Sequence, residues 1–85
     1  MLIMDQTKQI IVNLGNVNYI WIERKTNSIK ALLNLQPESP GEHFPKISLG
    51  TYQSLEDCQK VLRQIFTYYE EQERVFKMPL GGEVN

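Results

Sequence analysis

Apolar and polar residues alternate with a period of two along the first half of the chain, as in strands that bury one face. Turn-forming residues interrupt this alternation at Gly15-Asn16, within residues 24–28 and at the prolines after residue 36. The segments between them predict a four-stranded antiparallel β-meander. Its strands are expected at Lys8–Leu14, Val17–Glu23, Ile29–Leu35 and Lys46–Gln53.

Both faces of the segment Val17–Glu23 carry apolar side chains. Tyr19 and Trp21 share one face, and Ile20 and Ile22 share the other. A strand with this pattern is typical of the centre of a sheet, where both faces are covered. We expect one face to meet a helix and the other a partner.

The segment Gln36–Pro45 contains three prolines and Gly41, so it can neither donate a full ladder of hydrogen bonds nor continue a helix. It predicts an exposed loop, and loops of this length often carry binding residues. His43 and Phe44 are therefore candidate partner-binding residues. Further on, Gly50 predicts a bulge in the last strand or a close approach by the helix.

A helical spacing replaces the alternation after Ser54. Ser54 supplies an N-cap hydroxyl and Asp57 an acidic residue in the first turn. We expect one long helix from about Ser54 to Glu73, packed on the sheet, and then a short extended tail that ends near Pro79. The face expected to pack carries the apolar residues Leu55, Cys58, Leu62, Ile65, Phe66 and Tyr69.

Length and composition limit the protein to one small α+β domain. The 85 residues, of which 41% are hydrophobic, predict a single domain over 1–85 with an ordered core at about 8–79. A domain of this size buries a thin core. Because Val17–Glu23 offers more apolar surface than one helix covers, we expect a homo-oligomer, a dimer or higher.

Charge and cysteine content limit the binding partners and the cellular compartment that we expect for the protein. Nine Lys and Arg against ten Asp and Glu leave no basic excess, which argues against direct nucleic-acid binding. The single Cys58 fits a reducing compartment. The apolar residues before Asp5 are too few for a signal peptide or a membrane span. We expect a cytoplasmic protein without membrane contact.

No arrangement of residues indicates catalysis. His43 lies in the proline-rich segment without a nucleophile nearby in the sequence, and Cys58 falls on the apolar helical face, where a thiol fills a core. The acidic residues between Glu70 and Glu73 diverge around a helix and are interpreted as a solvated face. We expect no catalytic residue, no metal site and no cofactor, and therefore no enzyme.

Aromatic and basic residues give the better candidates for a site. Aromatic rings stack on nucleobases, and arginines bind phosphates with two hydrogen bonds. The competing interpretation is that Trp21 and Tyr69 supply buried area to a thin core. The candidate ligand-binding residues are Trp21, Arg24, Lys25, Arg63 and Tyr68.

Three stretches of the chain, NLGNV at 13–17, LGTYQSLEDCQKVL at 49–62 and VFKMP at 75–79, resemble small proteins encoded by phages and prophages of Firmicutes. The resemblance implies an accessory protein that acts in the host cytoplasm by stoichiometric binding against a host defence system. Two modes stay open. A homo-oligomer could sequester a small nucleotide signal between its subunits, or a monomer or dimer could inhibit a defence protein such as a nuclease.

Overall fold

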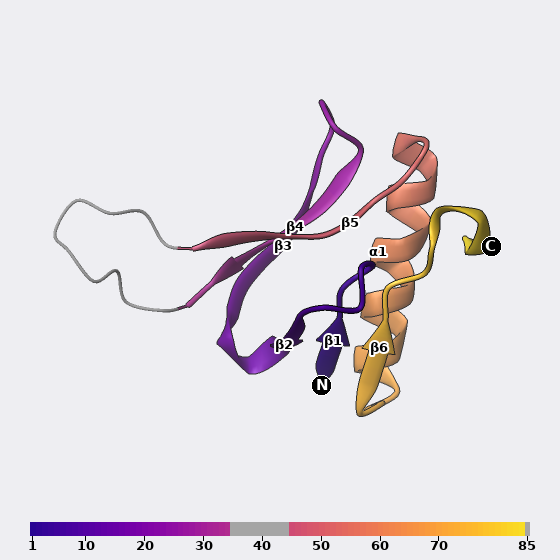
Figure 1. Ribbon diagram of the computed structural model, residues 1–85. Coiled ribbons are helices and arrows are strands. Elements are labelled where there is room, and N and C mark those ends of the chain that lie inside the picture. The colour runs from indigo at the N-terminus through magenta and orange to yellow at the C-terminus, as the bar shows by residue number, and fades with distance from the viewer. Residues whose placement is uncertain (35–44, 85) are drawn as a thin grey trace, which may run out of the picture.

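The computed structural model describes residues 1–34 and 45–84. Within these ranges the chain forms the helix α1 (Leu55–Glu70) and two three-stranded sheets, in the orders β2-β1-β6 and β3-β4-β5. Figure 1 shows α1 running beside both sheets. The α+β class is confirmed. The strands are β1 (Leu2–Met4), β2 (Ile11–Asn13), β3 (Val17–Glu23), β4 (Ser28–Leu33), β5 (Lys46–Thr51) and β6 (Val75–Lys77).

The predicted four-stranded meander is wrong at its first strand. β2 pairs antiparallel with β1, and β6 pairs with β1 in parallel, so these strands form a sheet of their own. Secondary structure thus begins at Leu2, ahead of the expected ordered core, and α1 is followed by another strand. Strands of three residues are too short to show an alternating pattern, which is why the sequence does not predict β1. β6 lies within the predicted extended tail, but its pairing with β1 is not part of that prediction.

A short turn separates the two sheets. Residues Leu14–Asn16 form a 3₁₀ turn, in which the Asn13 Oδ1 accepts a hydrogen bond of 3.0 Å from the Gly15 N–H. This turn directs the chain away from β2, so β2 and β3 do not form the expected hairpin. From β3 to β5 the three strands follow one another in antiparallel pairs, as predicted.

One apolar core joins the two sheets and the helix. Ile3 of β1, Ile29 of β4 and Val61 of α1 are each 0% exposed. Apolar side chains from three layers therefore meet at one place, and each layer covers the others. The buried cluster comprises Ile3, Val12, Ile29, Ala31, Leu49, Tyr52, Cys58, Val61, Ile65, Phe76 and Met78.

The helix begins as predicted but packs with a rotated face. The Ser54 hydroxyl oxygen accepts a hydrogen bond of 3.1 Å from the Asp57 N–H, which confirms the N-cap. Val61 lies at the centre of the buried face, whereas Leu62 is half-buried and Phe66 is 64% exposed. Successive helical residues are turned by about 100°, so the apolar residues on this flank lie beside the core face.

The helix ends at Glu70, three residues before the predicted end. Gln72 adopts a left-handed conformation with φ of 60°, and the N–H groups of Gln72 and Glu73 bond to the carbonyls of Tyr69 and Tyr68. These bonds close the last turn. The polar residues after Glu70 continue the charge pattern of the helix, so the sequence gives no signal for this stop.

Asp5 organises the turn between β1 and β2. The residue is 4% exposed, and its carboxylate accepts hydrogen bonds from the Thr7 Oγ1 at 2.6 Å, the Gln9 N–H at 3.0 Å and the Ile10 N–H at 2.9 Å. The Thr7 hydroxyl is the main cause that lowers the pKa of Asp5, with the backbone N–H groups adding to it and burial opposing it.

Gln6 closes the outer edge of β5 with both its backbone and its side chain. Its N–H donates to the Leu49 carbonyl at 2.7 Å, and its Oε1 accepts from the Thr51 N–H at 2.9 Å. Its Nε2 donates to the carbonyls of Thr51 at 3.0 Å and Pro79 at 3.3 Å. One residue thus links the two sheets and the C-terminal segment.

Gly50 lies next to an irregularity in the β4–β5 register, as the bulge prediction expects. The close neighbour is the ring of Tyr52 rather than the helix: a Cβ at Gly50 would lie 2.9 Å from the Tyr52 hydroxyl oxygen. That hydroxyl donates to the Pro79 carbonyl at 2.8 Å. Gly50 therefore leaves room for the ring that holds the C-terminal segment.

We expect Val61→Asp to unfold the protein, because an unpaired carboxylate in the shared core costs several kcal/mol. Arg63→Asp, on the exposed side of the same helix, is the matched control and should change the free energy of unfolding by about 0.5 kcal/mol or less. Thermal melts followed by circular dichroism measure both variants. A cooperative melt of Val61→Asp near that of the parent would contradict the position of the core.

The Asp5 turn predicts a loss of stability in acid. Because the folded state lowers the pKa of Asp5, its stabilisation is complete above the unfolded value of 3.8 and is lost as the pH falls through the lower folded value. Asp5→Asn should lower stability at neutral pH by roughly 1–3 kcal/mol and flatten this acid dependence. Urea titrations at several pH values test this, with Glu70→Gln as the exposed control. Parallel acid profiles for Asp5→Asn and the parent would contradict it.

Candidate binding surface

The β3–β4–β5 sheet carries a partly exposed aromatic pair on the face that points away from α1. Ile20 pairs with Ala31, which is fully buried, so Ile20 belongs to the inner face. Neighbouring side chains in a strand point to opposite faces, which places Tyr19 and Trp21 together on the outer face. Tyr19 is 64% exposed and Trp21 is half-buried.

A shallow hollow of about 490 Å³ lies on this side of the sheet and is lined by Tyr19, Ile20, Trp21, Leu32 and Lys46. The strand register explains the grouping, because Leu32 pairs with Tyr19 on one side and with Lys46 on the other. We call Tyr19, Trp21, Leu32 and Lys46 the outer aromatic face. It combines two aromatic rings, an aliphatic floor and a cation.

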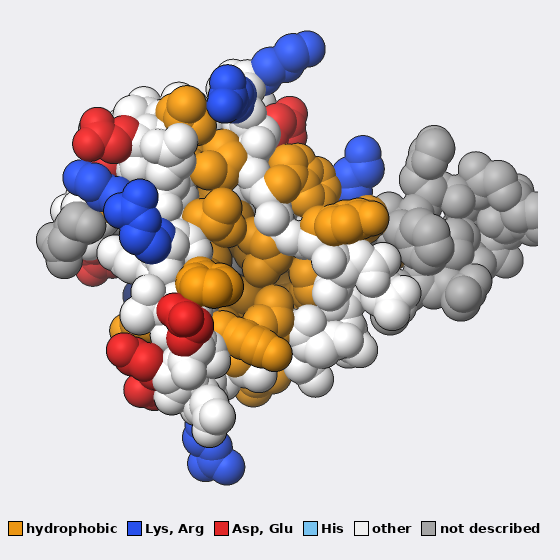
Figure 2. Space-filling model, turned by 180° about the vertical axis from the view of Figure 1, so that it is seen from behind, with side chains coloured by type: hydrophobic (Ala, Val, Ile, Leu, Met, Phe, Trp, Pro, Cys, Tyr) orange, Lys and Arg blue, Asp and Glu red, His pale blue; other side chains and the backbone are white. Residues whose placement is uncertain are grey.

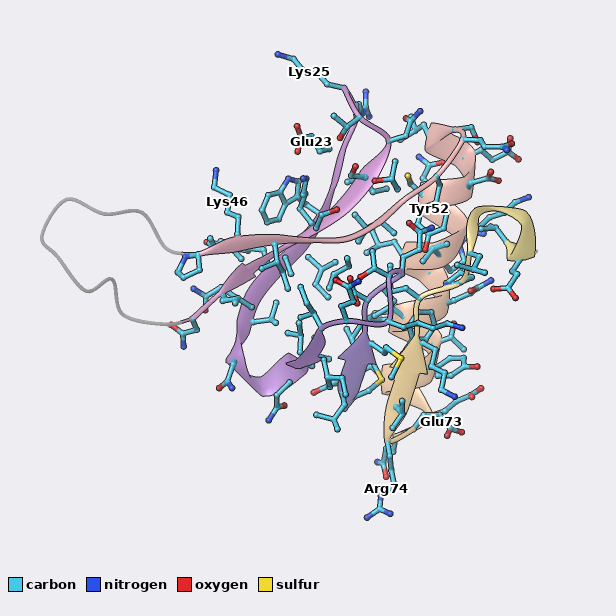
Figure 3. All side chains as sticks on the ribbon, viewed as in Figure 1. Glu23, Lys25, Lys46, Tyr52, Glu73 and Arg74 are labelled. Atoms are coloured by element: carbon cyan, nitrogen blue, oxygen red, sulfur yellow. The ribbon has the colours of Figure 1, made fainter. Side chains whose placement is uncertain are left out.

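Further charges surround the outer aromatic face. Lys30, which pairs with Trp21, forms a partly exposed salt bridge of 3.7 Å with Glu23. A pair that water still reaches contributes little to stability. Figure 3 shows Lys46 and Glu23 projecting from the sheet on the side away from α1. A ligand on this face would therefore meet charges of both signs, with Lys46 nearest the hollow.

The remaining candidates on the sheet lie at its tip. Arg24 and Lys25 are exposed in the turn between β3 and β4. Lys25 points away from the sheet in Figure 3. The strand rises about 3.3 Å per residue, so Arg24 starts about 10 Å along the chain from Trp21. Only an extended ligand would reach from the outer aromatic face to this turn.

Arg63 and Tyr68 lie together elsewhere, on α1. They line a depression of about 210 Å³ with Lys60, Gln64 and Thr67. The Tyr68 ring packs edge-on against Phe76, with centroids 4.8 Å apart. Because α1 covers the inner face of the sheet, this depression and Trp21 lie on different sides of it. Within one chain the five predicted ligand-binding residues therefore do not form one site.

The structure also bears on the other candidate residues and on residues of the hollow that the sequence analysis did not name as candidates. His43 and Phe44 lie outside the described residues. Tyr69, interpreted as a core residue, is instead 57% exposed. Lys46 was missed because its neighbours depend on the strand register, which the sequence does not reveal. Tyr19 shares the Trp21 face by simple alternation, and that signal was available.

Cys58 is buried, as its interpretation as a core residue expects. Its Sγ donates a hydrogen bond of 3.1 Å to the Asn27 carbonyl. Burial, and to a lesser degree the carboxylate of Asp57, raises the pKa of the thiol. A thiol held in its neutral form is a poor nucleophile. Cys58 therefore serves packing.

Two further features of the described ranges bear on function. A hollow of about 880 Å³ opens near the end of α1 and contains none of the candidate ligand-binding residues. No three His, Cys, Asp or Glu side chains of residues 1–34 and 45–84 are grouped as metal ligands. In the same ranges, no helix has the length and apolar character needed to cross a membrane.

Comparison with known proteins identifies no matching family model, curated protein or solved structure. The function must therefore be argued from the geometry of the surface.

If the outer aromatic face is a binding surface, its residues should matter little for folding. We expect Tyr19→Ala to change the free energy of unfolding by about 0.5 kcal/mol or less, because the side chain is mostly exposed. Phe76→Ala, which removes a buried ring, should cost about 3–5 kcal/mol. Urea denaturation measures both. A cost for Tyr19→Ala close to that of Phe76→Ala would show that the face is part of the core.

Proposed function

We propose that the protein is a non-enzymatic binding protein that captures a nucleotide-type ligand on its outer aromatic face. The observation that carries the proposal is the pair of Tyr19 and Trp21 on the sheet face that points away from α1, where Tyr19 is 64% exposed and Trp21 half-buried. Exposed aromatic area of this kind marks a surface that a ligand or partner covers.

The chemistry of the outer aromatic face suits such a ligand. Stacking of a base on an aromatic side chain contributes about 1–3 kcal/mol and tolerates any base, because every base has a π-face. Lys46 at the rim of the hollow would contact a phosphate as a point charge. A ligand with more than one phosphate could extend towards Arg24 and Lys25 in the turn.

The biological role that we propose follows from the resemblance to phage and prophage accessory proteins. A protein that holds a small nucleotide signal of a host defence system removes the signal by stoichiometry and needs no chemical step. It would act in the host cytoplasm as a homo-oligomer, and occupancy of the outer aromatic face would set its capacity.

The alternative is direct inhibition of a defence protein such as a nuclease. The same face supports this mode, because Trp and Tyr are enriched among the residues that dominate protein interfaces. The hollow is also lined mainly by apolar side chains, with Lys46 at its edge. A protein partner would cover the face without requiring a phosphate contact.

The proposal can be tested with lysate from defence-competent cells. The purified protein is incubated with the lysate, re-isolated and heat-denatured, and mass spectrometry identifies released small molecules. We expect a nucleotide at a fixed ratio to protein, reduced at least tenfold in Trp21→Ala and Tyr19→Ala. Tyr69→Ala is the matched control, because Tyr69 is similarly exposed but lies on α1.

A parallel pull-down separates the alternatives. A defence protein that is retained by the parent and lost with Trp21→Ala would support direct inhibition instead of sequestration. Chemical turnover of the bound molecule would overturn the non-enzymatic proposal, and equal capture by the parent and both variants would overturn the outer aromatic face as the site.

A further inference from the structure

The two edges of the β3–β4–β5 sheet differ in their hydrogen bonding. At β5 the end of the edge that leads to α1 is closed by Gln6, whose backbone and side chain bond to Leu49 and Thr51. At β3 the strand-to-strand hydrogen bonds run to β4, and the Val17 N–H bonds back to the Leu14 carbonyl in the preceding turn. From Tyr19 on, the outer edge of β3 therefore presents backbone groups without partners in the described ranges.

The residues whose N–H and C=O groups face this open edge can be identified. The N–H of Leu33 donates to Pro45 on the β5 side at 2.8 Å, and the N–H of Asn34 donates to Asn16 on the β3 side at 2.6 Å. Along a strand with an antiparallel neighbour on each side, successive residues form their backbone hydrogen bonds alternately with one neighbour and with the other. Even-numbered β4 residues therefore bond to β3.

The same alternation assigns the groups of β3. Trp21 pairs with Lys30, and Tyr19 pairs with Leu32. Both partners are even-numbered β4 residues, so the backbone N–H and C=O groups of Tyr19 and Trp21 bond to β4. The backbone groups of Ile20 and Ile22 then point out of the sheet, towards solvent in the isolated chain.

Beyond one irregularity near its start, the open edge lacks the usual protection against strand pairing. Natural edge strands carry lysines, prolines, inward-pointing charges or β-bulges that block a second strand. In β3 the register shifts between Val17 and Tyr19, so the stretch open to pairing begins after that point. The stretch Tyr19–Ile22 contains neither a charged residue nor a proline, and both of its faces carry apolar side chains. A second copy of this strand can therefore form backbone hydrogen bonds with it.

An apolar flank of α1 lies beside the same edge. Phe66 and Leu62 lie on the flank of α1 away from β6, because Tyr68 on the other flank packs against Phe76. Of the strands of the second sheet, α1 packs nearest to β3 and β4. Figure 2 shows hydrophobic side chains gathered in the hollow between the helix and the sheet.

We propose that a second copy of this chain pairs its β3 antiparallel to β3, making one continuous six-stranded sheet across a two-fold axis. A strand edge paired with its own copy is self-complementary under such an axis. Strands lie about 4.8 Å apart and α1 lies near β3 and β4, so the two helices would be about 10 Å apart, the spacing of packed helices. Phe66 of each copy would then be covered at the helix–helix contact.

The dimer extends the proposed function, on which this step rests. A continuous sheet places the two outer aromatic faces side by side on one surface, with Tyr19 and Trp21 of both copies at its centre. A ligand between the copies would then contact aromatic rings from each, which gives sequestration at a subunit interface a defined location.

Amide hydrogen exchange tests the edge pairing directly. We expect the N–H groups of Ile20 and Ile22 to become protected as the protein concentration rises, at least tenfold between the monomeric and dimeric ranges. Those of Tyr19 and Trp21 are the internal control, because they bond to β4 in either state. Light scattering on the same samples should show the mass rising from 9.9 kDa to twice that value.

A matched pair of variants tests the helix contact. Phe66→Glu places like charges opposite each other and should weaken dimerisation at least tenfold, whereas Thr67→Glu, one residue along and exposed on the outer side, should leave it unchanged. Circular dichroism confirms that both are folded; if Phe66→Glu is not, the exchange experiment on the parent decides.

Two results would overturn the inference. A mass near 9.9 kDa at high concentration would exclude the dimer, and a dimer in which Ile20 and Ile22 exchange as fast as in the monomer would exclude this edge. Neither result depends on a ligand. Loss of nucleotide capture with the dimer intact would contradict the proposed function alone.

Discussion

Ile3, Ile29 and Val61 meet in a core that no two of the three layers could enclose. Each sheet has three strands, few enough that its stability depends on a packed apolar face, and an isolated helix of this length is marginal in water. The layers therefore stabilise one another. Asp5 and Gln6 lie at the corner where the first sheet meets the second, so polar contacts fix the relative position of layers that the apolar core holds together.

The arrangement of layers explains why the binding surface lies where it does. The inner face of the second sheet packs in the core, and the helix and the first sheet both lie on that side. Its outer face is left without a covering layer, and the aromatic side chains of β3 are on it. The same three layers leave β3 as an edge strand. The exposed face and the open edge are thus two results of one small core.

The sequence predicted well whatever depends on local periodicity. The helix start at Ser54, the strand β3 and the burial of Cys58 follow from spacing and capping chemistry within a few residues. What depended on distant partners was not predictable: β1 is the central strand of its sheet only because β6, far along the chain, pairs with it on the side opposite β2. Likewise, Lys46 joins Trp21 only through a strand register set by hydrogen bonding, and His43 and Phe44 lie outside the described residues.

The burial of Cys58 and the position of Trp21 have a spectroscopic consequence. Each is the single residue of its kind in the chain, and they lie on opposite sides of the second sheet. The thiol can meet a labelling reagent only when the helix separates from the sheet, so its reaction rate reports opening of the core. The indole emission instead reports the polarity above the outer aromatic face. The natural sequence thus contains one reporter of core opening, the Cys58 thiol, and a separate reporter of ligand binding on the outer aromatic face, the Trp21 indole.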